Sequence, residues 1–240
     1  MNNDMNNKIY LIIGGTGGIG QAMIKQLVQE TAADQTDRQV DKSGITVFAT
    51  YHRNEPNFEA ENLHWLPMNI SDEDSIKKAA DTIKQTVGHV DWVINCVGLL
   101  HTKTAQPEKA LRQIETEFFL HNMQINALAS LLIAKHIKPL LAKAERSAEH
   151  PGIFATISAR VGSITDNQLG GWYSYRMSKA ALNMGMKNLS IEWGRSLKEV
   201  CVVVMQPGTV NTQLSAPFQG NVAEGHLFSP AYSAECLLEV

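Results

Sequence analysis

The sequence predicts an α/β fold in which one doubly wound domain has a parallel sheet flanked by helices. Two observations lead to this prediction. Apolar runs of strand length alternate with helical patterns along most of the chain, the order expected of a parallel sheet with helical crossovers. The runs are also nearly continuous in apolar residues, as in strands whose two faces are both buried. Because no repeat, low-complexity segment or interior linker interrupts residues 1–240, we expect a single domain.

The first half of the chain predicts four strands and two helices. A strand at residues 8–13 ends in a glycine-rich loop, and the helix that follows has Ile19, Met23, Leu27 and Val28 on one face. Residues 31–44 are polar and irregular, so we expect a surface loop there. The segment SDED at 71–74 predicts an N-cap and an acidic first turn for a helix that extends to about residue 87. The remaining strands of this half are expected at residues 45–50, 63–68 and 90–97.

The second half continues the alternation of strands and helices. Helical patterns cover residues 118–141 and 175–197, and each precedes an apolar run of strand length. These two strands are expected at 152–157 and 200–205. A last helix is expected to begin in the segment SPAYSAECLLEV at 229–240.

Composition and charge exclude several classes of function. A net charge of −3 argues against nucleic acid or an anionic membrane surface as a partner. The eight histidines are scattered, so we expect no dense metal site. The three cysteines form no CxxC pair and suit a reducing compartment. The polar start MNNDMNNK has no signal-peptide character, and no apolar run is long enough to span a bilayer. We therefore expect a soluble cytoplasmic protein.

The segment from Gly14 to Gly20 reads GGTGGIG and lies between a strand and a helix, as a dinucleotide-binding loop requires. Gly14 can make the tight turn, while Gly18 and Gly20 let the backbone approach a pyrophosphate and the helix pack on the strand. The phosphates would then lie at the helix N-terminus, whose free N–H groups attract anions. We predict a Rossmann-type cofactor site that includes Thr16 and Ile19; a flexible glycine-rich turn is the alternative. A P-loop is excluded because no Gly-Lys-Ser/Thr follows.

The spacing of these glycines resembles that of the short-chain dehydrogenase/reductase family, and further motifs extend the resemblance along the chain. The segment NCVG at 95–98 resembles the family's Asn-Asn-Ala-Gly, and Asn126 resembles its helix asparagine. Tyr175 and Lys179 match Tyr-x-x-x-Lys, and the segment PGTVNT at 207–212 resembles the part of the family that holds the nicotinamide. The resemblance implies an NAD(P)-dependent oxidoreductase. Its cofactor contacts would include Asn95, Gly98, Tyr175, Lys179, Pro207, Gly208, Val210 and Thr212.

The choice between NADP(H) and NAD(H) depends on the residues after the second strand. An acidic residue there would bind the ribose hydroxyl of NAD, but the chain continues as Thr50-Tyr51-His52-Arg53, without a carboxylate. Arg53 could pair with the extra phosphate of NADP, so we predict NADP(H) over NAD(H). The alternative is that Arg53 is a solvated surface charge. Asn69 stands where the family often has an aspartate that contacts the adenine, and it is a further predicted cofactor residue.

Two tyrosines, Tyr173 and Tyr175, compete for the role of proton donor. An unperturbed tyrosine has a pKa of about 10, and a nearby ammonium group lowers this pKa by favouring the phenolate. On a helix, a lysine four residues on lies on the same face as the tyrosine. Lys179 has this offset from Tyr175, whereas Tyr173 has Met177 there. We therefore predict Tyr175 and Lys179 as catalytic residues, with Tyr173 packing or lining the substrate pocket.

The catalytic serine of the family is harder to assign. In the family, the second serine of Ser-Ser-x-x-Gly hydrogen-bonds the substrate oxygen, but here SARVG at 158–162 has Ala159 at that position. Ser158 could shift into place, which we predict; Ser163 could supply the hydroxyl instead; or the site could lack this donor. The resemblance assigns Asn126 a catalytic role in a water-mediated proton relay. His101, in the loop after the NCVG segment, could line the pocket or be an ordinary loop histidine.

The segments SARVGSI, LGGWYSYR and FSPAYSAECLL resemble the branch of the family that contains C-factor-type and Sniffer-type carbonyl reductases. This resemblance implies NADPH-dependent reduction of an aldehyde or ketone. The alternative is a nucleotide-binding signalling or regulatory protein of the C-factor type with little or no turnover. We expect residues 211–225 to form a mobile substrate lid that bends at Pro217, Gly220 and Gly225. We also expect the family's last strand to be absent, although the resemblance implies a homodimer or homotetramer.

Overall fold

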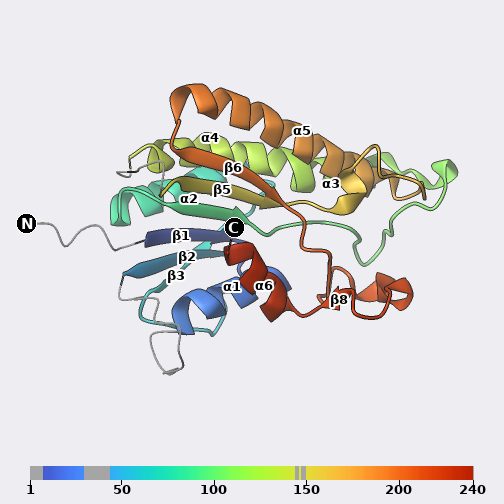
Figure 1. Ribbon diagram of the computed structural model, residues 1–240, viewed down its shortest axis with the longest axis horizontal. Coiled ribbons are helices and arrows are strands. Elements are labelled where there is room, and N and C mark those ends of the chain that lie inside the picture. Colours follow the sequence, from blue (N-terminus) through green and yellow to red (C-terminus); the bar gives the residue numbers. More distant parts are fainter. Residues whose placement is uncertain (1–7, 30–43, 144–145, 147–149, 240) are drawn as a thin grey trace, which may run out of the picture.

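The computed structural model describes residues 8–29, 44–143, 146 and 150–239. The surface loop predicted at 31–44 lies outside these residues except for Gly44. The described chain forms a six-stranded parallel sheet with the strand order β3-β2-β1-β4-β5-β6. Helices cover both of its faces, with α2, α4 and α5 on one side and α1 and α6 on the other (Figure 1). The predicted α/β fold class is therefore confirmed.

The amino-terminal half closely follows the sequence prediction. The central strand β1 buries Leu11, Ile12 and Ile13 completely, which explains why its sequence is apolar without alternation. The fourth strand, expected at residues 90–97, is shorter than predicted and extends from Trp92 to Asn95. The elements of this half are β1 (Lys8–Ile13), α1 (Gly18–Gln29), β2 (Ile45–Tyr51), β3 (Leu63–Pro67), α2 (Glu73–Thr86) and β4 (Trp92–Asn95).

The carboxyl-terminal half differs from the prediction at one helix. The single helix predicted at 118–141 is divided into α3 (Thr116–Met123), a π-helical turn η3 (Gln124–Leu128) and α4 (Ala129–Leu141). A π-turn widens the helix locally, and such turns are frequent at functional sites. Asn126 lies in this turn. The other main elements are β5 (Gly152–Ile157), α5 (Tyr173–Ser196) and β6 (Val200–Met205).

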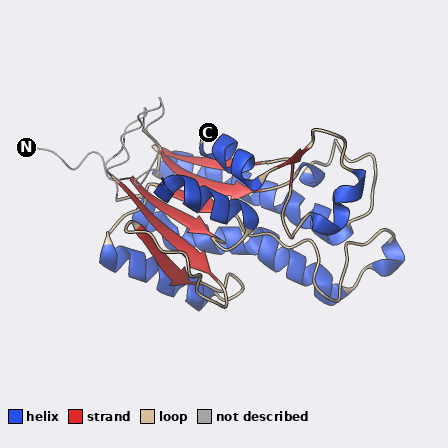
Figure 2. Cartoon of the chain, turned by 90° about the horizontal axis from the view of Figure 1, so that it is seen from below, coloured by secondary structure: helices blue, strands red, loops and turns tan. Residues whose placement is uncertain are grey.

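Smaller elements gather beyond the carboxyl ends of the strands, at one end of the molecule (Figures 1 and 2). A two-stranded sheet of β7 (Thr209–Val210) and β8 (Leu227–Phe228) encloses the predicted lid segment, which contains the short helix η5 (Ala216–Asn221). The chain then enters α6 (Pro230–Leu238), which packs on α1. Within the described residues, no further strand pairs with the free edge of β6. The remaining short helices are η2 (Leu111–Gln113) and η4 (Arg160–Gly162).

Two apolar cores hold these layers together, one on each face of the sheet. On the α5 face, Trp193 is 1% exposed and its ring packs edge-on against Phe154, with the centroids 5.5 Å apart. Burial of one such large apolar side chain stabilises a fold by about 1.5–3 kcal/mol. Because Trp193 lies on the same helix as Tyr175, this packing fixes the position of the predicted catalytic face. No helix of the described residues is long and apolar enough to cross a membrane.

Candidate active site

The glycine loop between β1 and α1 is tightly folded. Gly14 has a φ of +79°, a conformation that favours glycine, and its N–H donates to Thr50 Oγ1 at 3.0 Å. The Gly17 N–H donates back to the Gly14 carbonyl at 3.0 Å. A Cβ atom added at Gly20 would lie 2.4 Å from the Gly14 carbonyl oxygen, so α1 can start this close to β1 only with glycine there. The tight turn predicted at Gly14 and the packing of helix on strand predicted at Gly20 both agree with this geometry.

The start of α1 fits the phosphates of a dinucleotide. The first N–H groups of a helix have no carbonyl one turn earlier to bind, and they attract anions. Gly18 lies at this end and Thr16 is exposed in the loop before it, while Ile19 is half-buried. A Cβ atom added at Gly18 would lie 2.6 Å from Thr212 Cγ2. The segment after β7 therefore lies against the glycine loop, and these residues together could hold a nicotinamide dinucleotide.

Tyr175 and Lys179 are buried together in the first turns of α5, with 7% and 2% of their surfaces exposed. Lys179 Nζ lies 5.8 Å from the centre of the Tyr175 ring and donates to the Ile157 carbonyl at 2.9 Å. Burial raises the pKa of Tyr175 from 10.0 to about 12 and lowers the pKa of Lys179 from 10.5 to about 8. The predicted lowering of the Tyr175 pKa is therefore not found, because burial removes the phenol from water and disfavours the phenolate.

Asn126 joins the loop after β4 to this pair. Its Oδ1 accepts from the Leu99 N–H at 2.7 Å, and its Nδ2 donates to the Leu99 carbonyl at 2.8 Å. Its Nδ2 also donates to Ser178 Oγ at 2.9 Å. A Cβ atom at Gly98 would lie 3.6 Å from Lys179 Nζ, so this loop runs directly beside the lysine. The structure thus brings Asn126, Gly98 and Lys179 together, and the role of Asn126 in a proton relay stays a prediction.

Asn95, the last residue of β4, is buried and binds groups on both sides of the strand end. Its Oδ1 accepts from the Val97 N–H at 3.1 Å, and its Nδ2 donates to Ser130 Oγ at 2.9 Å. Ser130 in turn contacts Thr156 Oγ1 at 3.3 Å. Because both ends of the Asn95 side chain bind protein groups, Asn95 holds the loop in shape and would meet a cofactor mainly through that loop.

Both candidate serines have partners within the protein. Ser158 is buried and its Oγ donates to Asn183 Oδ1 on α5 at 2.7 Å. Ser163 Oγ accepts from the Asp166 N–H at 3.3 Å and lies 3.4 Å from Thr165 Oγ1, within a turn after η4. Ala159, at the family's serine position, has extended backbone and no hydroxyl. The assignment of Ser158 stays a prediction, and binding to a substrate would need its hydroxyl to leave Asn183.

Sequence reasoning missed Glu108, which anchors the start of α5. Its carboxylate is buried, accepts from the Ser174 N–H at 3.1 Å and also accepts from Ser174 Oγ. Its backbone carbonyl accepts from the Trp172 N–H. A carboxylate at a helix N-terminus is stabilised by the free N–H groups and the helix dipole. One signal was available in the sequence. Trp172, the N-cap residue of α5, has a side chain that cannot accept from the free N–H groups, so a residue elsewhere in the chain has to bind them.

Four ring side chains connect the predicted lid to Tyr175, and we call them the aromatic group: His101, Phe218, Trp172 and Tyr175. Phe218 of η5 packs edge-on against Trp172, with ring centres 5.0 Å apart, and against His101 at 5.8 Å. Trp172 then contacts the Tyr175 ring at 6.2 Å. Residues from three distant parts of the sequence therefore meet at the carboxyl end of the sheet. The mobility predicted for the lid at 211–225 stays a prediction.

The residues predicted to choose between NADP(H) and NAD(H) lie after β2 and β3. Arg53 is exposed and forms no hydrogen bond or ion pair with a described residue. Asn69 is half-buried, and its Oδ1 accepts from the Ser71 N–H at 3.1 Å just before α2. The loop after β6 contributes Gly208, whose φ is +74°, and Val210 of β7, which is buried; Pro207 precedes them.

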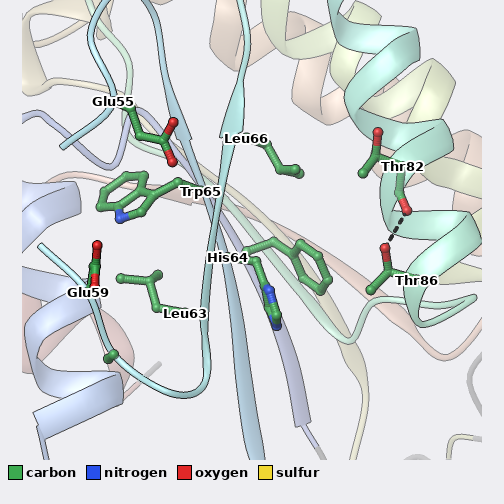
Figure 3. A pocket seen from close by; sticks show the side chains of 10 residues that line it. Glu55, Glu59, Leu63, His64, Trp65, Leu66, Thr82 and Thr86 are labelled. Atoms are coloured by element: carbon green, nitrogen blue, oxygen red, sulfur yellow. Dashed lines mark hydrogen bonds between the residues drawn. The ribbon is translucent and has the colours of Figure 1, made fainter. Parts of the chain in front are cut away.

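A separate open cavity of about 460 Å³ lies at the β3 edge of the sheet (Figure 3). His64, Trp65 and Leu66 of β3 line it together with Glu55 and with Thr82 and Thr86 of α2. None of its lining residues is among the predicted catalytic or cofactor residues. The acidic side chains of Glu55 and Glu59 in this open groove do not define a ligand, so the chemistry is better assigned to the region around Tyr175.

The sequence profile of the short chain dehydrogenase family matches residues 8–222. The chain therefore belongs to this family, and it is an NAD(P)-dependent oxidoreductase of the short-chain dehydrogenase/reductase type. This result agrees with the glycine loop at the start of α1 and with the buried Tyr175–Lys179 pair of α5.

Two relatives with specific names are similar to this chain in sequence. Benzil reductase ((S)-benzoin forming) from Bacillus cereus is 26% identical over 250 residues, which cover 95% of this chain and 92% of the relative. C-signal from Myxococcus xanthus is 32% identical over 131 residues, which cover 54% of this chain and 71% of the relative. The second similarity is higher but spans only about half of the chain.

Solved structures show the same fold at lower identity. NADPH-bound carbonyl reductase from chicken fatty liver has a TM-score of 0.77 and 24% identity, covering 98% of this chain and 87% of the other. The carbonyl reductase Sniffer of D. melanogaster has a TM-score of 0.74 and 22% identity, covering 97% and 90%. These similarities establish the fold and, at this identity, nothing about substrate.

Proposed function

We propose that the protein reduces an aldehyde or ketone to an alcohol with NADPH, and that Tyr175 is the proton donor. The observation that carries this proposal is the buried Tyr175–Lys179 pair beside Gly98 and Asn126. A bound nicotinamide would supply hydride to the carbonyl carbon. Tyr175 would give its proton to the carbonyl oxygen, which leaves a phenolate that must be protonated again.

Lys179 would assist this proton transfer in two ways. Its positive charge stabilises the phenolate that forms on Tyr175 as the proton leaves. Its own pKa, lowered by burial to about 8, allows the amine to release and regain a proton near neutral pH. Asn126, held against Leu99, would position the water that connects this amine to solvent.

The preference for NADPH is supported by the charge of Arg53. This guanidinium follows β2, is exposed and has no partner among the described residues, so it is available to a phosphate. We expect Arg53→Gln to raise the KM for NADPH by about tenfold and to leave the KM for NADH nearly unchanged, because one charge-assisted contact is lost. Lys198→Gln, which removes an exposed charge next to β6, is the control. An equal rise in both KM values would remove the argument from Arg53.

Tyr175→Phe tests the proposed chemistry directly. General acid catalysis contributes about 10²–10⁴ in rate, so we expect kcat to fall by at least about 10² while NADPH still binds. Turnover is measured by NADPH oxidation with a panel of aldehydes, ketones and quinones, and binding by NADPH fluorescence. Tyr173→Phe, two residues earlier on α5, should stay active. A fully active Tyr175→Phe enzyme would contradict the mechanism.

The second candidate is a signalling or regulatory protein that binds the nucleotide with little or no turnover. Ala159 at the family's serine position and the partial similarity to C-signal favour it. Placement in the branch of C-factor-type and Sniffer-type reductases is proposed on the same similarity. Tight NADPH binding without turnover of any carbonyl in the panel would support this candidate over the reductase.

We further propose that the protein acts in the cytoplasm as a homodimer or homotetramer. Cys201 and Cys236 are exposed free thiols, which suits a reducing compartment. The outer face of η3, α4 and α5 exposes large apolar side chains that a second copy could cover. They include Leu128, Leu131, Met184 and Ile191, with 39–63% of each surface exposed. Sedimentation of the purified protein tests this assembly.

A further inference from the structure

His101 has a buried polar atom without a partner. Its Nε2 is inaccessible to solvent and forms no hydrogen bond with any described residue. Buried polar atoms in proteins are nearly always paired, and an exception calls for an explanation. Two other buried side-chain atoms in the described part of the chain are unpaired. Arg146 Nε lies near Val90, just before β4, and Ser233 Oγ lies on α6.

The loop that carries His101 is held rigidly beside the predicted catalytic pair. Asn126 binds both the N–H and the carbonyl of Leu99, at 2.7 and 2.8 Å. Leu100 is buried, and Gly98 lies against Lys179. The backbone therefore leaves little freedom for the position of His101.

The aromatic group places His101 and Tyr175 around the same part of the molecule. The His101 ring packs on Phe218 at 5.8 Å, Phe218 on Trp172 at 5.0 Å, and Trp172 on Tyr175 at 6.2 Å. Phe218 belongs to the predicted lid, so the lid contacts both the His101 ring and, through Trp172, the Tyr175 ring.

The position that holds a serine in the family is Ala159 in this chain, and the two neighbouring serines already have hydrogen-bond partners. Ala159 has no hydroxyl, and the Ser158 hydroxyl donates to Asn183 at 2.7 Å. Ser163 is held in its own turn by the Asp166 N–H. His101 Nε2 is thus an unpaired polar atom in the aromatic group that contains Tyr175.

We propose that His101 is a catalytic residue whose Nε2–H donates a hydrogen bond to the carbonyl oxygen of the substrate; this rests on the proposed carbonyl reduction. A neutral imidazole carries its proton on one ring nitrogen, and the tautomer protonated at Nε2 provides this donor. The hydrogen bond stabilises the negative charge that grows on the oxygen as hydride arrives at the carbon. Tyr175 then transfers its proton to the same oxygen, and His101 keeps its own.

Two substitutions separate this role from a structural one. His101→Phe keeps a ring against Phe218 but removes the donor, whereas His101→Gln keeps an N–H donor and loses the ring. With acetophenone as the probe, we expect His101→Phe to lower kcat by about 10², the effect of losing one oxyanion donor. His101→Gln should recover at least about tenfold of this loss, and both should bind NADPH as the wild type does. His121→Phe, on the exposed side of α3, is the control.

The opposite order of activities, with His101→Phe faster than His101→Gln, would show a packing role and overturn the proposal. Unchanged kcat in His101→Phe would overturn it too. A second measurement does not need turnover: benzamide has a carbonyl oxygen that accepts a hydrogen bond and is not reduced. We expect benzamide to bind the complex of protein and NADP about tenfold more weakly in His101→Phe. Should the wild type reduce no carbonyl, the proposed function fails, and equal benzamide binding would separately reject His101.

Discussion

The glycine loop and the region around Tyr175 are constructed in different ways. The loop is shaped mainly by its own backbone, since Gly14 has a φ of +79° and the Gly17 N–H donates to the Gly14 carbonyl at 3.0 Å. The Tyr175 region depends on bonds between distant segments. Glu108 binds Ser174 across 66 residues, Asn126 binds Leu99 across 27, and Ser158 binds Asn183 across 25.

This difference predicts how each region responds to change. A glycine in the loop is required by backbone geometry, so its replacement should act on cofactor binding directly. A residue near Tyr175 has partners that belong to other elements, so its replacement leaves a buried group without a partner. Four substitutions, from the largest expected effect to the smallest, test this contrast.

Lys179→Met tests the cost of burying a charge in the Tyr175 region. The folded pKa is about 8, against 10.5 for a free lysine, so between these values the unfolded chain binds the proton and the folded chain does not. Lys179 should therefore contribute a rise with pH in the free energy of unfolding across this window, of up to about 3 kcal/mol. The rise is read as the difference between the wild type and Lys179→Met, because the raised pKa values of Cys96 and Tyr175 act in the opposite direction. Lys179→Met lacks this rise. Urea unfolding at about pH 8 and about pH 10 measures it, with exposed Lys198→Met as the control.

Gly20→Ala tests the glycine loop. The added Cβ would lie 2.4 Å from the Gly14 carbonyl oxygen, a backbone atom that cannot move without distorting the loop. We expect a loss of about 1–3 kcal/mol in stability and weaker NADPH binding by at least about tenfold, since a displaced loop misplaces its N–H groups. Gly194→Ala, in an exposed part of α5 with nothing within 4 Å, should be neutral or stabilising. Equal stability of the two variants would contradict the interpretation.

Glu108→Gln tests whether the start of α5 positions Tyr175. The amide retains one acceptor but turns an N–H₂ group towards Ser174, which donates to both oxygens in the wild type. We expect a loss of about 1–2 kcal/mol in stability and a fall in kcat with little change in the KM for NADPH. Glu117→Gln, on the exposed side of α3, is the control. A normal kcat in Glu108→Gln would mean that the position of Tyr175 does not depend on this carboxylate.

Ser158→Ala should have the smallest effect on stability. It removes the donor to Asn183, a single hydrogen bond of about 1 kcal/mol. If Ser158 binds the substrate, as the sequence predicts, kcat should fall by about 10² or more; if His101 has that role, kcat should fall by less than about tenfold. Ser163→Ala measured beside it tests the remaining serine. This prediction therefore decides between the sequence-based assignment and the one that His101 suggests.

Most of the fold could be predicted because its signals are local. Every strand of the main sheet was expected within a few residues of its observed bounds, since buried parallel strands have nearly continuous apolar sequences. The π-turn at Asn126 was not predicted, because hydrophobic periodicity does not distinguish an α-helix from one with a single wider turn. The short strands β7 and β8 were also missed, since two-residue strands leave no pattern.

The candidate site could be predicted where spacing alone decides. Lys179 lies four residues after Tyr175, and this offset selected the tyrosine without a structure. The pKa of Tyr175 could not be predicted in the same way, because it depends on how deeply the ring is buried and on where Lys179 Nζ points. Burial raises the pKa of Tyr175, whereas the sequence predicted that Lys179 would lower it.

The sequence by itself determined the doubly wound fold, the glycine loop and the choice of Tyr175. Each of these depends on periodicity or on backbone geometry within a few neighbouring residues. Only the tertiary structure decided that Ser158 binds Asn183, that Glu108 caps α5 and that His101 Nε2 is left unpaired. The physical reason is that a hydrogen bond between distant residues forms only where packing brings donor and acceptor within about 3 Å of each other, and no local pattern records that distance.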